Sequence, residues 1–349
     1  MTSRPKQPAW SRASDRELLA LQLRQLRLGR PRRPALRRAM RRLERELQAR
    51  DLMLRPHFWF SEEWFSPDGV PGIAIPFYLA HPRLERLERR LSGRVEGGNV
   101  TSLMRILRHE AGHAIDSAFR LHRRRLWRSA FGSPTRAYPD HYRVDPGSRR
   151  FVRHLDLWYA QAHPAEDFAE TFAVWLTPRS NWRVRYAGSA ALRKLEAVDA
   201  LMADIAGRRP PVRSMLHVDT VAESKLSLQE YYRRMLSRQA RTDIAIVDRA
   251  LGRAFIARPE RGPARRAETF LRAERSELLR RSTPAVSRPG EHTFAAYDQA
   301  QWLQLAISRC RERQLWMRGS KAECAAVALR MMRRLRRLGA AGNRLQFTL

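Results

Sequence analysis

Residues 108–116 contain the pattern H-E-x-x-H, with His109, Glu110 and His113 at its fixed positions. On an α-helix, residues i and i+4 lie on one face about one turn apart, so the two histidines can direct their imidazole nitrogens at a single ion. Imidazole binds Zn²⁺ at about 2.0–2.1 Å. Glu110 would lie beside the metal, where its carboxylate can accept a proton from a water molecule. The pattern predicts a hydrolytic zinc site that still needs a third protein ligand.

The alternative interpretation is a helix that carries two unrelated histidines. Gly112, between the two histidines, argues against it. A glycine inside a helix costs about 1 kcal/mol relative to alanine, so its presence indicates a reason in packing or function.

A second segment supplies carboxylates. Pro164 suits the first turn of a helix, which predicts a helix over residues 164–176 with Glu166 and Glu170 four positions apart. Both lie among large apolar side chains, where an unpaired buried carboxylate would be costly. A cation between the two helices would remove that cost. Either glutamate could be the third ligand, with the other bonding a ligand histidine.

The helix with the histidines is expected to begin near Thr101 or Ser102, either of which could cap it. Asp116 lies three residues after His113 and on the same face. Its carboxylate could fix the tautomer of a ligand histidine, or it could simply be solvated.

Residues 72–79 form an extended apolar run, and Pro76 suits an edge strand because it cannot donate a hydrogen bond to a neighbour. Such a strand beside the zinc helix could pair with an extended peptide, or it could be an ordinary core strand. Residues 129–150 are expected to form a long ordered loop. The fold class expected is α+β and mainly helical, a zincin-like catalytic domain with a small edge-stranded sheet and flanking basic helices.

The chain has 349 residues and a net charge of +33, with 68 basic and 35 acidic residues. The excess lies in the flanks, where residues 1–56 carry a net +11 and residues 208–349 a net +17, against +5 for the stretch between them. Solvated basic helices are the ordinary interpretation. The alternative is a surface for an acidic partner or a nucleic acid. We expect five segments: a basic helical hairpin (1–56), a metallopeptidase domain (57–207), a helical extension (208–256), an Arg/Pro-rich connector (257–290) and basic C-terminal helices (291–349). The two helices of the hairpin are expected near residues 14–28 and 35–54.

The two cysteines, Cys310 and Cys324, are too few for a disulfide framework, which suits a reducing compartment. No apolar run is long enough for a membrane span, and residues 1–14 do not resemble a signal peptide. The expected location is therefore the cytoplasm.

Together, the two motif segments resemble the gluzincin metallopeptidases, and more narrowly their lethal-factor-like branch. In that branch, H-E-x-G-H-A-x-D is followed by a tyrosine, six residues, and E-x-F-A-E-x-F. This chain has His109-Glu-Ala-Gly-His113-Ala-Ile-Asp116, then Tyr159, then Glu166-Asp-Phe-Ala-Glu170-Thr-Phe172. The region 57–207 also resembles the bacterial family of putative zinc-binding metallopeptidases.

The resemblance implies that His109, His113 and Glu166 are zinc ligands and that Glu110 is the general base. It further implies that Tyr159 donates a hydrogen bond to the oxyanion, while Glu170 supports a ligand without touching the metal. The expected function is zinc-dependent hydrolysis of a peptide or protein substrate. The rival is a non-catalytic binding protein, stabilised by zinc, whose basic flanks contact a nucleic acid or an acidic partner.

Overall fold

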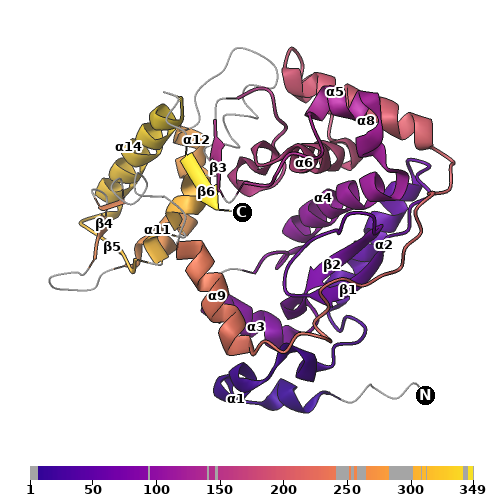
Figure 1. Cartoon of the computed structure of the whole chain (residues 1–349). Helices are drawn as coiled ribbons and strands as arrows, with labels where there is room; N and C mark the ends of the chain where they lie inside the picture. Colours follow the sequence, from indigo (N-terminus) through magenta and orange to yellow (C-terminus); the bar gives the residue numbers. More distant parts are fainter. Residues whose placement is uncertain are drawn as a thin grey trace. The chain divides into compact units, whose positions relative to one another are not determined.

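The computed structural model describes residues 7–92, 95–139, 141–145, 148–240, 251–252, 255–257, 265–282, 302–307, 309–311, 313–340 and 345–348. Within these ranges the chain is mainly helical and its strands pair in short two-stranded sheets (Figure 1). This confirms the expected α+β, mainly helical class. Among the helices described, none is both long and apolar enough to cross a membrane.

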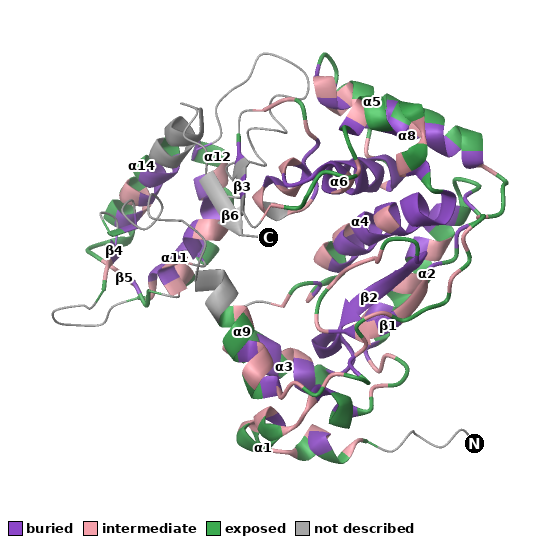
Figure 2. Cartoon of the chain, viewed as in Figure 1, coloured by how far each residue is buried: buried purple, intermediate pink, exposed green. Residues whose placement is uncertain are grey.

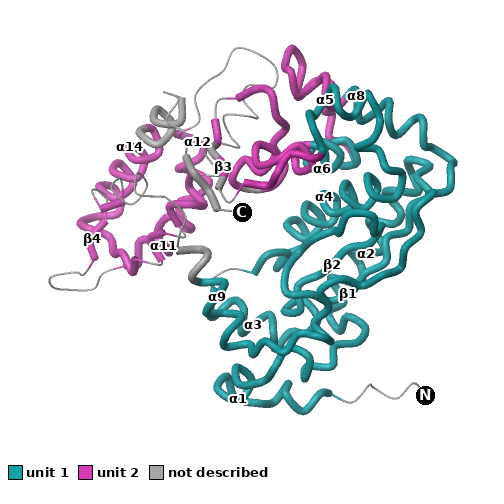
Figure 3. Tube along the Cα trace, viewed as in Figure 1, with its two compact units in different colours: residues 1–134, 168–178, 196–241 teal, residues 135–167, 179–195, 242–349 magenta. Residues whose placement is uncertain are grey.

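The chain divides into two compact units (Figure 3). Unit 1 comprises Met1–Pro134, Phe168–Pro178 and Glu196–Arg241, and unit 2 comprises Thr135–Asp167, Arg179–Leu195 and Thr242–Leu349. Two helices contribute residues to both, namely α6 (Pro164–Leu176) and α8 (Ala190–Ile205).

Unit 1 is built around α4, which spans Val100–Phe119. Its other elements are η1 (Ala9–Arg12), α1 (Asp15–Ala20), η2 (Leu23–Leu26), α2 (Pro34–Gln48), β1 (His57–Ser61), β2 (Gly72–Pro76), η3 (Phe77–Leu79), α3 (Pro82–Leu91), η4 (Leu121–Arg123), α5 (Arg125–Phe131) and α9 (Leu228–Ala240). Most of α4 is buried, on several sides rather than along one stripe (Figure 2). A helix buried in this way is held by neighbours on more than one side.

One neighbour of α4 is α2, from the basic N-terminal segment. The guanidinium of Arg108 donates to both carboxylate oxygens of Glu46, from Nε at 2.7 Å and from Nη2 at 2.8 Å. Both side chains are buried, and such bidentate pairs fix geometry as well as charge. Because Arg108 directly precedes His109, α2 helps to position the part of α4 that carries the histidines.

The sheet beside α4 is formed by β1 and β2, which run parallel with Trp59 opposite Ala74. All five residues of β2 are buried, and the backbone N–H of Ala74 donates to the carbonyl of Phe65 at 2.8 Å. The strand therefore fits the core-strand interpretation, because its outer edge already carries a hydrogen bond from within the chain.

The first expected helix, near residues 14–28, is interrupted. It begins as expected with a capping box formed by Ser14 and Glu17, but α1 ends at Ala20. The backbone of Leu21 and Leu23 then exchanges hydrogen bonds with the segment 226–228. These tertiary bonds replace the helical ones, so apolar spacing alone could not locate the break. Likewise α2 ends at Gln48, before the expected position near residue 54.

Unit 2 contains β3 (His141–Val144), η5 (Asp156–Gln161), α7 (Trp182–Arg185), β4 (Phe255–Ile256), α11 (Ala267–Ala273), α12 (Arg275–Ser282), β5 (Trp316–Met317), α14 (Lys321–Ala340) and β6 (Leu345–Thr348). The sheets pair β3 with β6 and β4 with β5, both antiparallel. Its apolar core includes Trp158, Phe270 and Trp302. The expected connector 257–290 carries α11 and α12, and its residues 258–264 and 283–290 lie outside the described ranges, as does the start of the expected C-terminal helices.

Candidate metal centre

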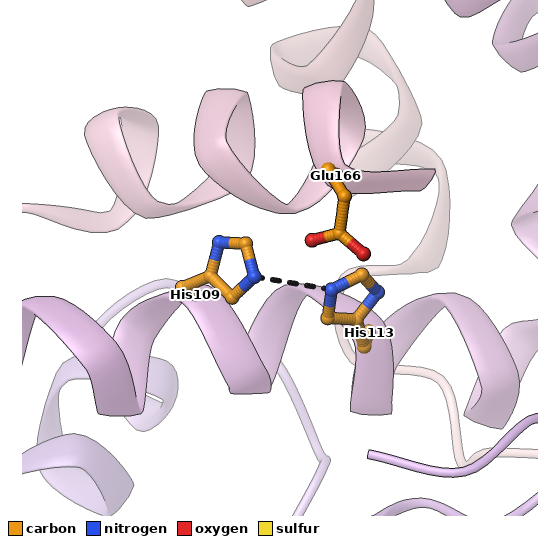
Figure 4. A group of neighbouring side chains, drawn as sticks. All are labelled: His109, His113 and Glu166. Atoms are coloured by element: carbon orange, nitrogen blue, oxygen red, sulfur yellow. Dashed lines mark hydrogen bonds between the residues drawn. The ribbon is translucent and has the colours of Figure 1, made fainter. Parts of the chain in front are cut away.

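Helix α4 presents His109 and His113 one turn apart on the same face. The helix begins at Val100, and the Asn99 side chain caps it by accepting a hydrogen bond from the backbone N–H of Ser102 at 2.9 Å. The cap is thus two or three residues earlier than expected. The Nε2 atoms of the two histidines lie 3.2 Å apart (Figure 4). Two imidazoles therefore direct the same type of nitrogen at one point.

Helix α6 spans Pro164–Leu176, which are the bounds that the sequence predicted. Glu166 lies in its first turn, where the helix dipole favours a negative charge. In Figure 4 its carboxylate points toward the two imidazole rings. One ligand atom from each of His109, His113 and Glu166 lies within 4.8 Å of the others, and His109 and Glu166 are buried.

Glu170, one turn further along α6, binds the far side of the first histidine. Its Oε1 lies 3.0 Å from Nδ1 of His109, and its side chain is fully buried. A carboxylate is an acceptor when it is ionised, so Nδ1 of His109 carries the proton and donates it. The lone pair of Nε2 is then left for a metal ion, which is how a carboxylate commonly orients a ligand histidine.

These residues fit Zn²⁺. For tetrahedral zinc with nitrogen ligands at 2.0–2.1 Å, two ligand nitrogens lie about 3.3 Å apart. The observed separation of the Nε2 atoms is 3.2 Å. Two histidines and one carboxylate are also a donor set found in catalytic zinc sites, where a fourth position is left for water or substrate. The cluster therefore could hold zinc.

The close approach of α4 and α6 depends on a glycine. A Cβ atom placed on Gly112 would lie 2.8 Å from the Cα atom of Ala169 and 3.1 Å from its carbonyl oxygen. Gly112 lies between the two histidines of α4, and Ala169 between the two glutamates of α6. This contact is the packing reason for a glycine in the middle of the helix.

Glu110 follows His109 on α4, and the residue is 5% exposed. Its backbone carbonyl accepts a hydrogen bond from the Ser66 hydroxyl at 3.0 Å, which ties this turn of α4 to the loop after β1. The carboxylate is thus held in a largely dry environment next to a candidate ligand, where a group that accepts and returns a proton is useful.

Asp116 does not contact a candidate ligand. Its Oδ1 accepts from the backbone N–H of His122 at 2.7 Å and lies 3.0 Å from Nδ1 of the same residue. The side chain is 12% exposed, so it is not a solvated carboxylate either. In this structure Asp116 stabilises the turn that follows α4.

The pair of Asp116 and His122 predicts a pH-dependent stability. The hydrogen bond to Asp116 is the main reason that the pKa of His122 is raised above 6.5, against the opposing effect of burial. Folding therefore favours the protonated ring, so the stabilisation is present below the unfolded-state pKa and is lost as the pH rises through the raised value. We expect His122→Ala to lower the free energy of unfolding by about 1 kcal/mol more near pH 5.5 than near pH 8.5.

Urea denaturation of the metal-free chain, with a chelator in the buffer, measures the free energy of unfolding at the two pH values. In an Asp116→Asn background the pH-dependent part should disappear, because the charged partner is gone while the amide oxygen can still accept from the backbone. An equal loss of stability at both pH values would contradict the assignment.

The tyrosine that the resemblance implicates, Tyr159, lies in η5, five residues before α6 begins. Its ring packs at the apolar core of unit 2, with its centroid 6.2 Å from that of Tyr142. A different tyrosine reaches a candidate ligand. The hydroxyl of Tyr138 donates to Oε1 of Glu166 at 3.0 Å. Tyr138 falls in the stretch expected to be a loop, where no periodicity or motif marks a residue as functional.

Comparison with known protein families also points to a metal site in this part of the chain. Residues 92–249 match the model of a family described as "Putative zinc-binding metallo-peptidase". The matched span contains both histidines and both glutamates of the candidate centre. No curated protein and no solved structure matches the chain. The family match and the cluster of His109, His113 and Glu166 together support a metallopeptidase with a peptide or protein substrate.

Proposed function

We propose that this chain is a zinc-dependent peptidase of the gluzincin type, with a zincin-like catalytic domain. The zinc ligands would be His109, His113 and Glu166. The observation that carries the proposal is the arrangement around His109, whose Nε2 lies 3.2 Å from that of His113 while Glu170 holds its Nδ1 at 3.0 Å. Histidines that bind a metal almost always donate the other ring N–H to a carboxylate, a carbonyl or water, as His109 does to Glu170.

The bound zinc ion would supply a Lewis acid that lowers the pKa of a water molecule and polarises a carbonyl group. Glu110 would accept the proton of the attacking water and return it to the leaving amine. Neither a free hydroxide ion nor an amide anion would then have to form. The Tyr159 hydroxyl would donate a hydrogen bond to the carbonyl oxygen as negative charge develops on it. Glu170 would keep His109 in the tautomer that offers Nε2.

The proposal predicts one zinc ion per chain. His113→Ala removes one ligand while leaving the buried pair of His109 and Glu170 in place. We expect it to abolish stoichiometric zinc binding, and we expect peptide hydrolysis by the wild-type chain to stop in a chelator and return with added zinc. Metal analysis and digestion of a peptide library by the purified full chain measure both.

A wild-type chain that lacks stoichiometric zinc would refute the proposal. A wild-type chain that binds zinc but cleaves nothing in the library would instead favour the rival function, a zinc-stabilised binding protein. The exposed arginines of α2, which include Arg37, Arg38, Arg41 and Arg45, are the surface that such a protein would offer to a polyanion. A salt-dependent affinity for RNA or DNA would support that rival.

A further inference from the structure

Tyr138 makes two contacts that together fix its place beside a candidate ligand. Its hydroxyl donates to Oε1 of Glu166 at 3.0 Å, and its ring stacks on that of His163, with the centroids 3.8 Å apart and the planes 18° from parallel. The residue is nevertheless 55% exposed. A tyrosine that is mostly exposed contributes little to an apolar core. Its hydrogen bond and its ring stacking therefore indicate a role other than core packing.

His163 is the platform on which Tyr138 rests. The residue is 3% exposed, and its Nδ1 accepts from the backbone N–H of Ala165 at 3.1 Å, which caps the start of α6. The other ring nitrogen, Nε2, is then the one that carries a proton, and it lies 2.7 Å from the carbonyl oxygen of Arg136. One buried ring therefore joins the first turn of α6 to the segment that carries Tyr138.

We propose that Tyr138 is a positioning residue for the third zinc ligand, a role that rests on the proposed function. A carboxylate has two oxygens, and the phenol holds one of them, which leaves the other to face the two histidines. Ligating carboxylates are usually oriented by such hydrogen bonds. The chemistry of the donor also matters, because a neutral phenol orients Glu166 without neutralising the charge that attracts the cation. An arginine or a lysine in its place would compete with the metal.

The test compares the removal of single hydroxyl groups. Tyr138→Phe keeps the ring that stacks on His163 and deletes only the donor to Glu166. Tyr142→Phe is the matched control, since its hydroxyl donates to the backbone carbonyl of Leu157 at 3.1 Å. Zinc affinity of the metal-free full chain is measured by competition with a chromophoric chelator. We expect Tyr138→Phe to weaken zinc binding by about 10-fold, and the control to bind as the wild type does.

Two further readouts separate positioning from a general structural role. The urea midpoint of the metal-free Tyr138→Phe chain should equal that of the wild type, while the visible spectrum of its cobalt(II) form should change, because the cobalt spectrum reports the ligand geometry. His163→Asn keeps a good helix cap and removes the platform. It should also weaken zinc binding, and the double variant should be no weaker than Tyr138→Phe alone, because both act through one hydrogen bond.

The outcomes are distinct. If the wild type binds one zinc ion and Tyr138→Phe binds it equally well with an unchanged cobalt spectrum, the positioning role is wrong while the proposed function stands. If the wild type binds no zinc, the proposed function fails and this role with it. A comparison with Tyr159→Phe adds a further distinction, because loss of an oxyanion donor should lower kcat and leave the zinc affinity unchanged.

Discussion

Glu110→Gln is expected to bind one zinc ion per chain with wild-type affinity and to hydrolyse peptides about 10²–10⁴-fold more slowly. The amide keeps the shape of the carboxylate but cannot take a proton from water. Glu110 lies next to His109 on α4 and is 5% exposed, so few solvent molecules can replace it as a base. The zinc affinity should hold because the proposed ligands are His109, His113 and Glu166, and none of them changes.

The experiment needs zinc content and kcat/KM for a single cleaved peptide on the same preparation. Glu44→Gln is the matched control, because it makes the same chemical change on α2, at a residue that is not part of the cluster of His109, His113 and Glu166. Unchanged hydrolysis by Glu110→Gln would mean that Glu110 is not the base. Loss of zinc together with activity would mean that the carboxylate supports the metal site instead.

The sequence predicted the parts of the centre that depend on local rules. Pro164 fixed the start of α6, and the spacing of His109 and His113 needs only a helix to bring both rings to one point. The sequence also left open which glutamate would bind the metal. The structure supports Glu166 as the candidate ligand, because Glu170 is the residue that bonds Nδ1 of His109.

What the sequence did not predict depends on contacts between distant segments. Tyr138 donates a hydrogen bond to Glu166, which lies 28 residues later in the sequence. No motif or periodicity around Tyr138 predicts this contact. Asp116 shares a face with the histidines, yet a turn that returns toward α4 supplies His122 as its partner. The burial of α4 also depends on distant segments, because its buried residues lie on several sides of the helix.

Gly112→Val is expected to destabilise the chain by about 3 kcal/mol, although valine forms helices better than glycine does. The reason is the contact with Ala169, whose Cα atom would lie 2.8 Å from the new Cβ. These are backbone atoms that cannot rotate away, so α4 and α6 would have to separate. Because the contact lies between the two histidines on one helix and the two glutamates on the other, zinc affinity should fall by at least about 10-fold as well.

Gly112→Ala and Gly29→Ala form the pair that isolates this effect. A Cβ on Gly29 meets nothing within 4 Å, whereas one on Gly112 meets the backbone of Ala169. In an isolated helix, alanine at position 112 would be stabilising by about 1 kcal/mol. In the folded chain we expect Gly112→Ala to lower the free energy of unfolding instead, while Gly29→Ala should leave it nearly unchanged. Urea denaturation and zinc titration of both variants measure the difference. A stabilised Gly112→Ala chain would show that α4 and α6 do not approach so closely, and the geometry proposed for the zinc ligands would then have to be abandoned.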